Sequence, residues 1–470
     1  NFDDTAAVRW VGQSQLGGDT LIPAGLLHAY DGRRCFEAAY TFYPIIREAL
    51  PIAGGTLTSG ALYTYVAVFV FTDYAGRKWR SAPSLPFSGT PSGVNLTLRL
   101  RITHYSVTSM TDSTVNFTFP PGVEVYRQSV GDTGFKRLAI GSGAVFPVDP
   151  TSTTHIQIDD SNLSTDGQPI LYTDGGVLDN VTPPPCRYSC IWDNRVWLAG
   201  CDDPEVLFFS KEIVDAEAAG FDLDQNQRID DGKGVVALTV QDASLIAFKG
   251  DNDGVFHIQG QGPDDTGSNS AYTLPQKIMT SVGCADPRSV LTGNDGTFFQ
   301  SLRGIENLGR QLAPGIFGKN VQDSLDAAGF VTSVRFEPNS GEYRFTAPIG
   351  NLGQILVYTQ DTQCWSIDFL YDAASSNGDQ KVLDATVISG TYYMLSSTGY
   401  VWTELPGTYI GDSKDGSSVW VGSGFITGDI ALAGPLGQIS HFNIALLGRK
   451  AGAHGLSLIC QLDQGATASF

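Results

Sequence analysis

The feature that most constrains the fold is a short unit that recurs through the second half of the chain. An aliphatic strand is followed by a polar turn and then by an aromatic-rich strand, as at 244–258, 289–301 and 392–402. Gly, Asp and Asn, which turns favour, separate the strands. Repeated meanders over about 260 residues predict a β-propeller built of small packed sheets. A stacked array of β-sandwiches is the rival interpretation, but the irregular spacing of the units favours the propeller.

Helical periodicity is scarce in this chain. Only three short segments show it, at 211–219, 286–291 and 321–328. Charged residues make up 17% of the chain, while 54 glycines and 23 prolines supply the residues that many tight turns need. These observations predict an all-β protein with a few short helices.

A different pattern occupies residues 50–175. Residues 63–71 alternate in hydropathy over one long strand, a turn follows at 73–76, and further strands are expected at 94–102 and 122–127. Long strands at this spacing predict a seven-stranded β-sandwich of fibronectin III or immunoglobulin-like character. Its position predicts an insertion between propeller blades.

The predicted organisation therefore has four parts, and it includes six blades of about 45 to 50 residues each. The parts are the first propeller strands at 1–49, the inserted sandwich at 50–175, the main propeller at 176–450 and a C-terminal strand or docking segment at 451–470.

Charge and cysteine content narrow the possible functions. The chain has 29 Lys and Arg against 49 Asp and Glu, a net charge of −20. Such a charge repels phosphate backbones and argues against wrapped DNA, while a non-adhesive conduit for DNA stays compatible. The seven cysteines form no CxxC pair, so we expect reduced, mostly buried thiols. No apolar run is long enough for a membrane anchor.

No motif in the sequence predicts catalysis. HExxH, GxSxG and P-loop patterns are absent, and the six histidines lack metal-ligand spacing. Residues 222–226 begin like a calcium loop, but Gln227 and Lys233 stand where glycine and glutamate are needed. Residues 413–420 resemble the Asp-box of sialidase propellers in one copy with a displaced glycine. We expect no enzyme, no cofactor and no metal.

Several soft motifs resemble the propeller proteins of podophage tails, known as tail nozzle, tail tubular or packaged-DNA stabilisation proteins. The motifs are 21–32 followed by 36–37, 63–65, 73–76, 81–84, 125–127 with 135–138, 178–185, 194–200, 205–210, 283–290, 296–305, 341–345, 355–358 and Trp365. Their order along the chain, most clearly from 178 to 210, carries the resemblance.

The resemblance implies a structural virion protein that forms a homo-oligomeric, sixfold ring in a short phage tail. Such a ring lies below the portal and adaptor, contacts tail fibres or a needle, retains packaged DNA and conducts it during ejection. It implies assembly in the host cytoplasm, localisation in the virion, no membrane anchor, and only transient, non-specific contact with passing double-stranded DNA.

Acidic, glycine-rich turns are the candidate channel loops under this hypothesis, because an acidic wall leaves no deep binding wells for a sliding duplex. Outward solvated turns are the alternative interpretation. The candidate residues are Asp222, Asp224, Asp230, Asp231, Asp251, Asp253, Asp264 and Asp265.

Two other functions fit the same sequence. A glycan-active, sialidase-like propeller would have a pocket of acids and aromatics at its mouth. Its aromatics would come from Trp192, Trp197, Trp365 and Trp402, although core packing also explains these residues. A receptor-binding adhesin would instead place recognition in the sandwich.

Overall fold

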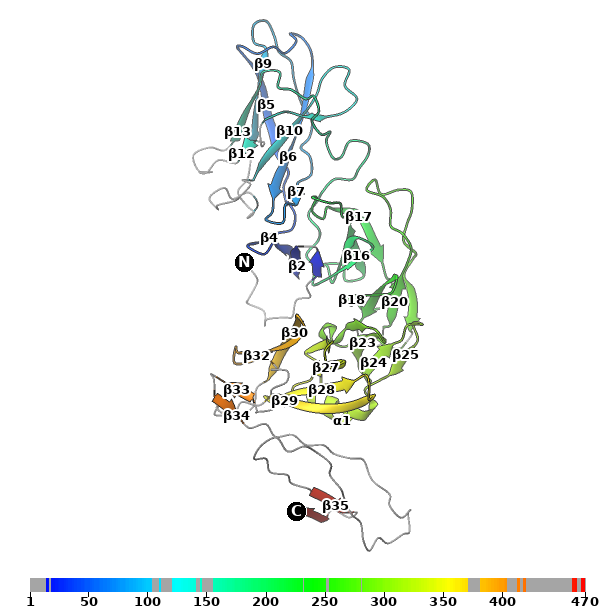
Figure 1. The fold of residues 1–470 in the computed structure, drawn as a ribbon. Helices are drawn as coiled ribbons and strands as arrows, with labels where there is room; N and C mark the ends of the chain where they lie inside the picture. Colours follow the sequence, from blue (N-terminus) through cyan, green and yellow to red (C-terminus); the bar gives the residue numbers. More distant parts are fainter. Residues whose placement is uncertain are drawn as a thin grey trace. The chain divides into compact units, whose positions relative to one another are not determined.

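In the computed structural model, most of the chain up to residue 403 is described (Figure 1). The described residues are 14–16, 18–103, 110, 121–140, 144–145, 155–230, 232–250, 253–279, 281–370 and 381–403, with four short strands beyond them. The chain divides into two compact units, Asn1–Gln322 and Asp323–Phe470.

Unit 1 contains four antiparallel sheets whose strands follow one another in chain order. The first sheet contains β1 (Ser14–Leu16), β2 (Asp19–Ala24), β3 (Leu26–Tyr30) and β4 (Cys35–Glu37), and the second contains β14 (Tyr188–Trp192), β15 (Arg195–Ala199), β16 (Val206–Ser210) and β17 (Phe221–Arg228). The third sheet contains β18 (Val235–Gln241), β19 (Ser244–Lys249), β20 (Val255–Ile258) and β21 (Gln276–Met279). The fourth contains β22 (Leu291–Gly293), β23 (Gly296–Ser301), β24 (Gly304–Leu308) and β25 (Pro314–Ile316).

Unit 2 continues the same pattern with two further meander sheets. They are β26 (Ser333–Glu337), β27 (Glu342–Thr346), β28 (Gly353–Thr359) and β29 (Cys364–Leu370), and then β30 (Val382–Ile388), β31 (Thr391–Ser396) and β32 (Val401–Thr403). Two hairpins follow, β33 (Asp412–Lys414) with β34 (Ser417–Val419) and β35 (Ile459–Leu462) with β36 (Ala466–Ser469). Residues 415–416 and Trp420 of the Asp-box-like segment lie outside the described residues.

The first strands of neighbouring sheets contact each other, β1 with β14, β14 with β18 and β18 with β22 in unit 1, and β26 with β30 in unit 2. Small hydroxyl side chains make this close approach. Ser14 Oγ lies 2.8 Å from Ser189 Oγ, and Thr239 Oγ1 lies 2.9 Å from Thr292 Oγ1. Sheets joined through their first strands are propeller blades. Six meander sheets of blade form lie in the described part of the chain, four in unit 1 and two in unit 2.

The predicted sandwich is present as two sheets between β4 and β14, in the orders β11-β10-β6-β7 and β13-β9-β5, with β8 pairing β6 and β12 pairing β10. Its strands are β5 (Ile45–Ile52), β6 (Tyr63–Thr72), β7 (Lys78–Arg80), β8 (Phe87–Gly89), β9 (Thr97–Thr103), β10 (Gly122–Gln128), β11 (Lys136–Arg137), β12 (Ala144–Val145) and β13 (His155–Asp160). The module begins at Ile45, before the predicted boundary at residue 50, because β5 pairs with β9.

The core of the sandwich lies on both faces of β6. Tyr65, Phe69 and Phe71 pack in the same cluster as Leu100 of β9 and Val125 of β10. On the opposite face, Val66 and Val68 pack with Tyr126 and Leu171. The first cluster also includes Phe36 of the first blade and Phe221 of the second blade, so the sandwich shares one core with both.

Only one of the three predicted helices forms as predicted. The helix α1 (Gln322–Ala328) confirms the prediction at 321–328, while 286–291 holds only a 3-10 turn at Pro287–Ser289. The helix predicted at 211–219 is wrong, because this segment is irregular, turns at Asp215–Ala216 and forms a bridge from Glu217 to Lys78 of β7. Within the described residues, no helix has the length and hydropathy that crossing a membrane requires.

Candidate functional site

The connections between blade strands alternate between two ends of the second and third blades, because the strands are antiparallel. One end, here the tip end, carries the connections at 202–205, 229–234 and 250–254. The other, here the junction end, carries those at 193–194, 211–220 and 259–275. The predicted channel acids divide between these two ends.

The tip end gathers acids from two neighbouring blades around Arg228. Arg228 Nη1 donates to Asp203 Oδ2 at 2.6 Å, Nη2 donates to Glu205 Oε2 at 2.8 Å, and Nε contacts Asp230. Across the blade boundary, Asp253 accepts a hydrogen bond from the Lys233 N–H at 2.7 Å. The acidic tip comprises the four acids of these contacts and the adjacent, exposed Asp202, and its residues are Asp202, Asp203, Glu205, Asp230 and Asp253.

The two blades meet closely beneath the acidic tip. The Val235 N–H donates to the Pro204 carbonyl at 2.8 Å. The Lys249 side chain is fully buried, and its Nζ donates to the Ile229 carbonyl at 2.7 Å and lies 3.8 Å from Glu205 Oε1. The hydrogen bond from Arg228 holds the pKa of Asp203 below its ordinary value. Asp203 therefore carries its charge at neutral pH, on a backbone that hydrogen bonds between the two blades hold in place.

Of the predicted channel acids, Asp230 and Asp253 belong to this acidic tip. Asp231 and Asp251 lie outside the described residues. Asp202, Asp203 and Glu205 were not predicted as site residues, because they follow a different strand and only the pairing of β16 with β17 brings them near Asp230.

At the junction end, Asp264 and Asp265 fasten a long loop, 259–275, to its neighbours. Asp264 Oδ1 accepts from the Thr266 N–H at 2.9 Å and from the Thr266 hydroxyl at 2.6 Å. These hydrogen bonds lower the pKa of Asp264 to about 2. Asp265 Oδ1 accepts from the Glu212 N–H at 3.1 Å, and its carbonyl accepts from the Leu178 N–H at 2.9 Å.

The charges of Asp222 and Asp265 also interact with that of Lys211, whose side chain is almost fully buried. Lys211 Nζ donates to the Leu178 carbonyl and, at 2.8 Å, to Asn180 Oδ1. Burial lowers the pKa of Lys211 to about 8, while the charges of Asp265, Asp222 and Asp179 oppose that shift. These acids thus neutralise a buried cation, which is a structural role.

Asp224 is an exposed residue of the outermost strand of its blade, β17, and its N–H donates to Asp222 Oδ1 at 2.9 Å. The alternating acids of 222–226 therefore follow the two-residue period of a strand, not the path of a calcium loop. Among the residues that the structure describes, no group of three or more His, Cys, Asp or Glu is placed to hold a metal ion.

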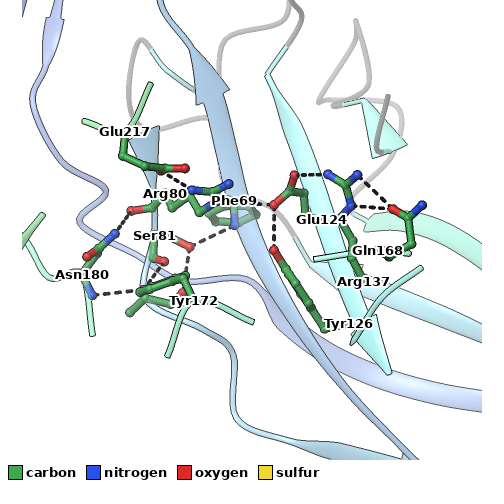
Figure 2. Close-up of polar contacts among 11 residues, drawn as sticks. Phe69, Arg80, Ser81, Glu124, Tyr126, Arg137, Gln168, Tyr172, Asn180 and Glu217 are labelled. Atoms are coloured by element: carbon green, nitrogen blue, oxygen red, sulfur yellow. Dashed lines mark hydrogen bonds and ion pairs between the residues drawn. The ribbon is translucent and has the colours of Figure 1, made fainter. Parts of the chain in front are cut away.

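Beside the junction end, the sandwich is joined to the second blade by the junction network of Figure 2. Arg80 of β7 contacts Glu217 through its guanidinium and lies 3.5 Å from Glu124 Oε2 of β10. Glu124 Oε1 accepts from Arg137 Nη1 at 2.8 Å, and Arg137 Nη2 donates to Gln168 Oε1 at 3.0 Å. The network thus crosses the sandwich from the blade to the far strand β11.

The same network includes the linker that leaves the sandwich. The Tyr172 hydroxyl donates to the Ser81 carbonyl at 2.8 Å and accepts from the Asn180 N–H at 3.1 Å (Figure 2). The Lys78 N–H donates to the Ala216 carbonyl at 2.9 Å, and the Ala218 N–H donates to the Lys78 carbonyl at 3.0 Å. The sandwich is therefore fixed by backbone pairing as well as by charge.

The ionisation of Glu124 keeps this network charged. Burial by itself raises the pKa of Glu124, but the charge of Arg80 and hydrogen bonds from Tyr126 and Arg137 outweigh it and leave the pKa below its ordinary value. Glu124 is consequently an anion near neutral pH, paired with two arginines.

In each unit, the tryptophans proposed for a glycan pocket pack against other apolar or aromatic side chains. Trp192 and Trp197 are buried in an aromatic cluster with Phe209 and Tyr272, with ring centroids 4.7 to 5.5 Å apart. In the other unit, Trp365 packs against Phe345 and Tyr358. Core packing therefore accounts for these three side chains.

The meander blades and the inserted module define the class of this protein as a β-propeller with an inserted β-sandwich. No protein-family model and no curated protein matches the chain. Among solved structures it is similar to BamB from Moraxella catarrhalis, at 12% identity and a TM-score of 0.24, covering 85% of this chain and 95% of that one. It is also similar to a protein from Lactobacillus plantarum, at 9% identity and a TM-score of 0.27, covering 73% and 95%. Likenesses this remote carry no argument about function.

Proposed function

We propose that this chain is a structural ring subunit of a short phage tail, which forms part of the channel that retains and then conducts packaged DNA. The acidic tip carries this proposal. Carboxylates from two neighbouring blades, at Asp203, Asp230 and Asp253, are held at one end of the blades on a fixed backbone. The podophage-like order of sequence motifs supports the same function.

The electrostatics of the acidic tip suit a surface that DNA passes without binding. Unpaired basic side chains would bind phosphates and slow a sliding duplex. At the acidic tip, Arg228 is engaged by three carboxylates and Lys249 is buried, while Lys233 is exposed beside Asp253, so the five acids of the tip outnumber its bases. With a net charge of −20 on each subunit, a ring multiplies this repulsion.

The proposal is tested by mixing the purified protein with portal–adaptor complexes of a short-tailed phage and imaging the products. Capping of the adaptor by a coaxial ring, and retention of DNA by capped heads, are the expected results. If the protein stays unassembled at all concentrations and hydrolyses or captures glycans, a glycan-directed function would replace this proposal.

The acidic tip is tested separately by charge reversal. We expect a variant with Asp202, Asp203 and Asp230 changed to Lys to form the same assemblies but to bind duplex DNA, with an affinity that falls steeply as salt rises. The matched control changes Asp264, Asp265 and Asp222 at the junction end, where we expect loosened folding and no gain in DNA binding. Unchanged ejection and unchanged DNA binding in the tip variant would remove the acidic tip from the channel wall.

A further inference from the structure

The tip of the β6–β7 hairpin, at 73–77, is seated on the first blade by three carboxylates that are almost fully buried. Asp19 is 0% exposed, Asp31 is 5% exposed and Asp73 is 2% exposed. Asp31 Oδ2 accepts from the Tyr74 N–H at 3.0 Å, and the Arg33 guanidinium lies 3.6 Å from the centre of the Tyr74 ring. The contact joins the sandwich to the first blade.

Donors are distributed unequally over the three carboxylates. Asp31 also accepts from the N–H groups of Arg33 and Arg34. Asp73 accepts from the Arg77 N–H and from Trp79 Nε1, each at 2.8 Å. Asp19 Oδ2 accepts from Arg77 Nη1 at 2.8 Å, but Asp19 Oδ1 is buried and has no hydrogen-bond donor among the described residues.

A buried acceptor without a donor is costly, and an ionised carboxylate offers only acceptors. The neighbouring Asp73 carboxylate is also an acceptor, so two ionised groups would repel each other beside one arginine. A proton on Asp19 removes the repulsion and supplies the missing donor. The cluster therefore favours one bound proton while the hairpin is seated.

We propose that Asp19 and Asp73 form a proton-binding site that couples the seating of the β6–β7 hairpin on the first blade to pH. The groups that face Asp19 are Asp73 and Arg77 on the hairpin and Asp31 on the blade. Burial and the charge of Asp73 raise the pKa of Asp19 to about 7, and the charge of Arg77 opposes them.

Proton linkage gives the direction in which pH changes the seating of the hairpin. The seated state binds the proton with a pKa of about 7, while an exposed Asp19 has a pKa of 3.8. Between these values the seated state holds more protons, so seating weakens steadily as pH rises and the weakening is complete above about 7. A low pH closes this contact and a high pH loosens it.

The test is hydrogen exchange of the whole chain, read by mass spectrometry on peptides covering 18–24 and 70–80 and corrected for intrinsic exchange at each pH. Between pH 5 and 8.5 we expect protection of these peptides to fall at least about tenfold, since each unit of pKa difference allows a factor of ten. In Asp19→Asn, which keeps a donor at every pH, we expect the fall to disappear.

Asp159→Asn is the matched control, because Asp159 pairs with Arg99 on an exposed face of the sandwich and should leave the fall unchanged. If Asp19→Asn does not fold, infrared spectra of the unchanged protein decide, since a protonated carboxyl band must vanish on titration through neutral pH. Protection that is equal at both pH values, or a band that is absent at pH 5, would overturn the proposal.

Discussion

At the residue scale, the fixed position of the sandwich depends on charged side chains far apart in sequence. Arg80 and Glu217 are 137 residues apart, and Arg80 has a side chain only 13% exposed. No periodicity or motif links such residues, because the pairing of β7 with the segment at 211–219 creates the contact. The sequence therefore indicated the two modules but not the ion pairs between them.

Arg80→Met should lower the free energy of unfolding by about 2 to 4 kcal/mol, because it leaves the buried Glu124 and the partly exposed Glu217 without this partner. Urea unfolding measures the effect. Arg99→Met is the matched control, since its pair with Asp159 is exposed and should contribute little. Equal losses in the two variants would contradict the role given to the junction network.

Lys211 gives a pH-dependent prediction with the opposite sign to that of Asp19. Its folded pKa of about 8 lies below the ordinary value of 10.5, so the unfolded chain binds more protons between these values. Stability contributed through this group should therefore rise between pH 8 and 10.5. The difference in unfolding free energy between the unchanged protein and Lys211→Met, measured at pH 8 and 10, should show that rise. A difference that is constant with pH would contradict it.

At the element scale, strands were predicted well where apolar and polar residues alternate along the chain. They were also predicted well where a run of apolar residues is buried on both faces of a sheet, as in β6. The segment at 211–219 shows why one helix was wrong. Its alanines and acids suit a helix, but the backbone groups of Ala216 and Ala218 pair with Lys78 instead. The acidic tip was predicted only in part, because its residues lie on separate connections. Only the order of the strands in the sheets brings these connections together.

Ala218→Pro tests that pairing, because proline lacks the N–H that donates to the Lys78 carbonyl. We expect faster hydrogen exchange in peptides covering 76–81 and 211–219, with little change in the β14–β15 hairpin. Val214→Pro is the control, since the Val214 N–H donates no hydrogen bond to another described residue. Equal effects of the two prolines would show that the segment is not held by Lys78.

At the scale of the whole molecule, repetition of one short unit was enough to predict a propeller, and a change of strand length was enough to indicate an insertion, although its first strand begins before the predicted boundary. Function does not follow from such a fold alone. The function proposed for this chain rests on where charge accumulates, at the acidic tip, and on the podophage-like motif order. In the proposed ring, the acidic end of each copy would repel the DNA that passes it.

The most direct test of this account is the mass of the purified 50.3 kDa chain by light scattering over a range of concentrations, paired with negative-stain images of the same samples. The account predicts a discrete species near six times the chain mass, appearing as rings with an open centre. A monomer at every concentration, with no ring in any image and none formed on an adaptor, would contradict it.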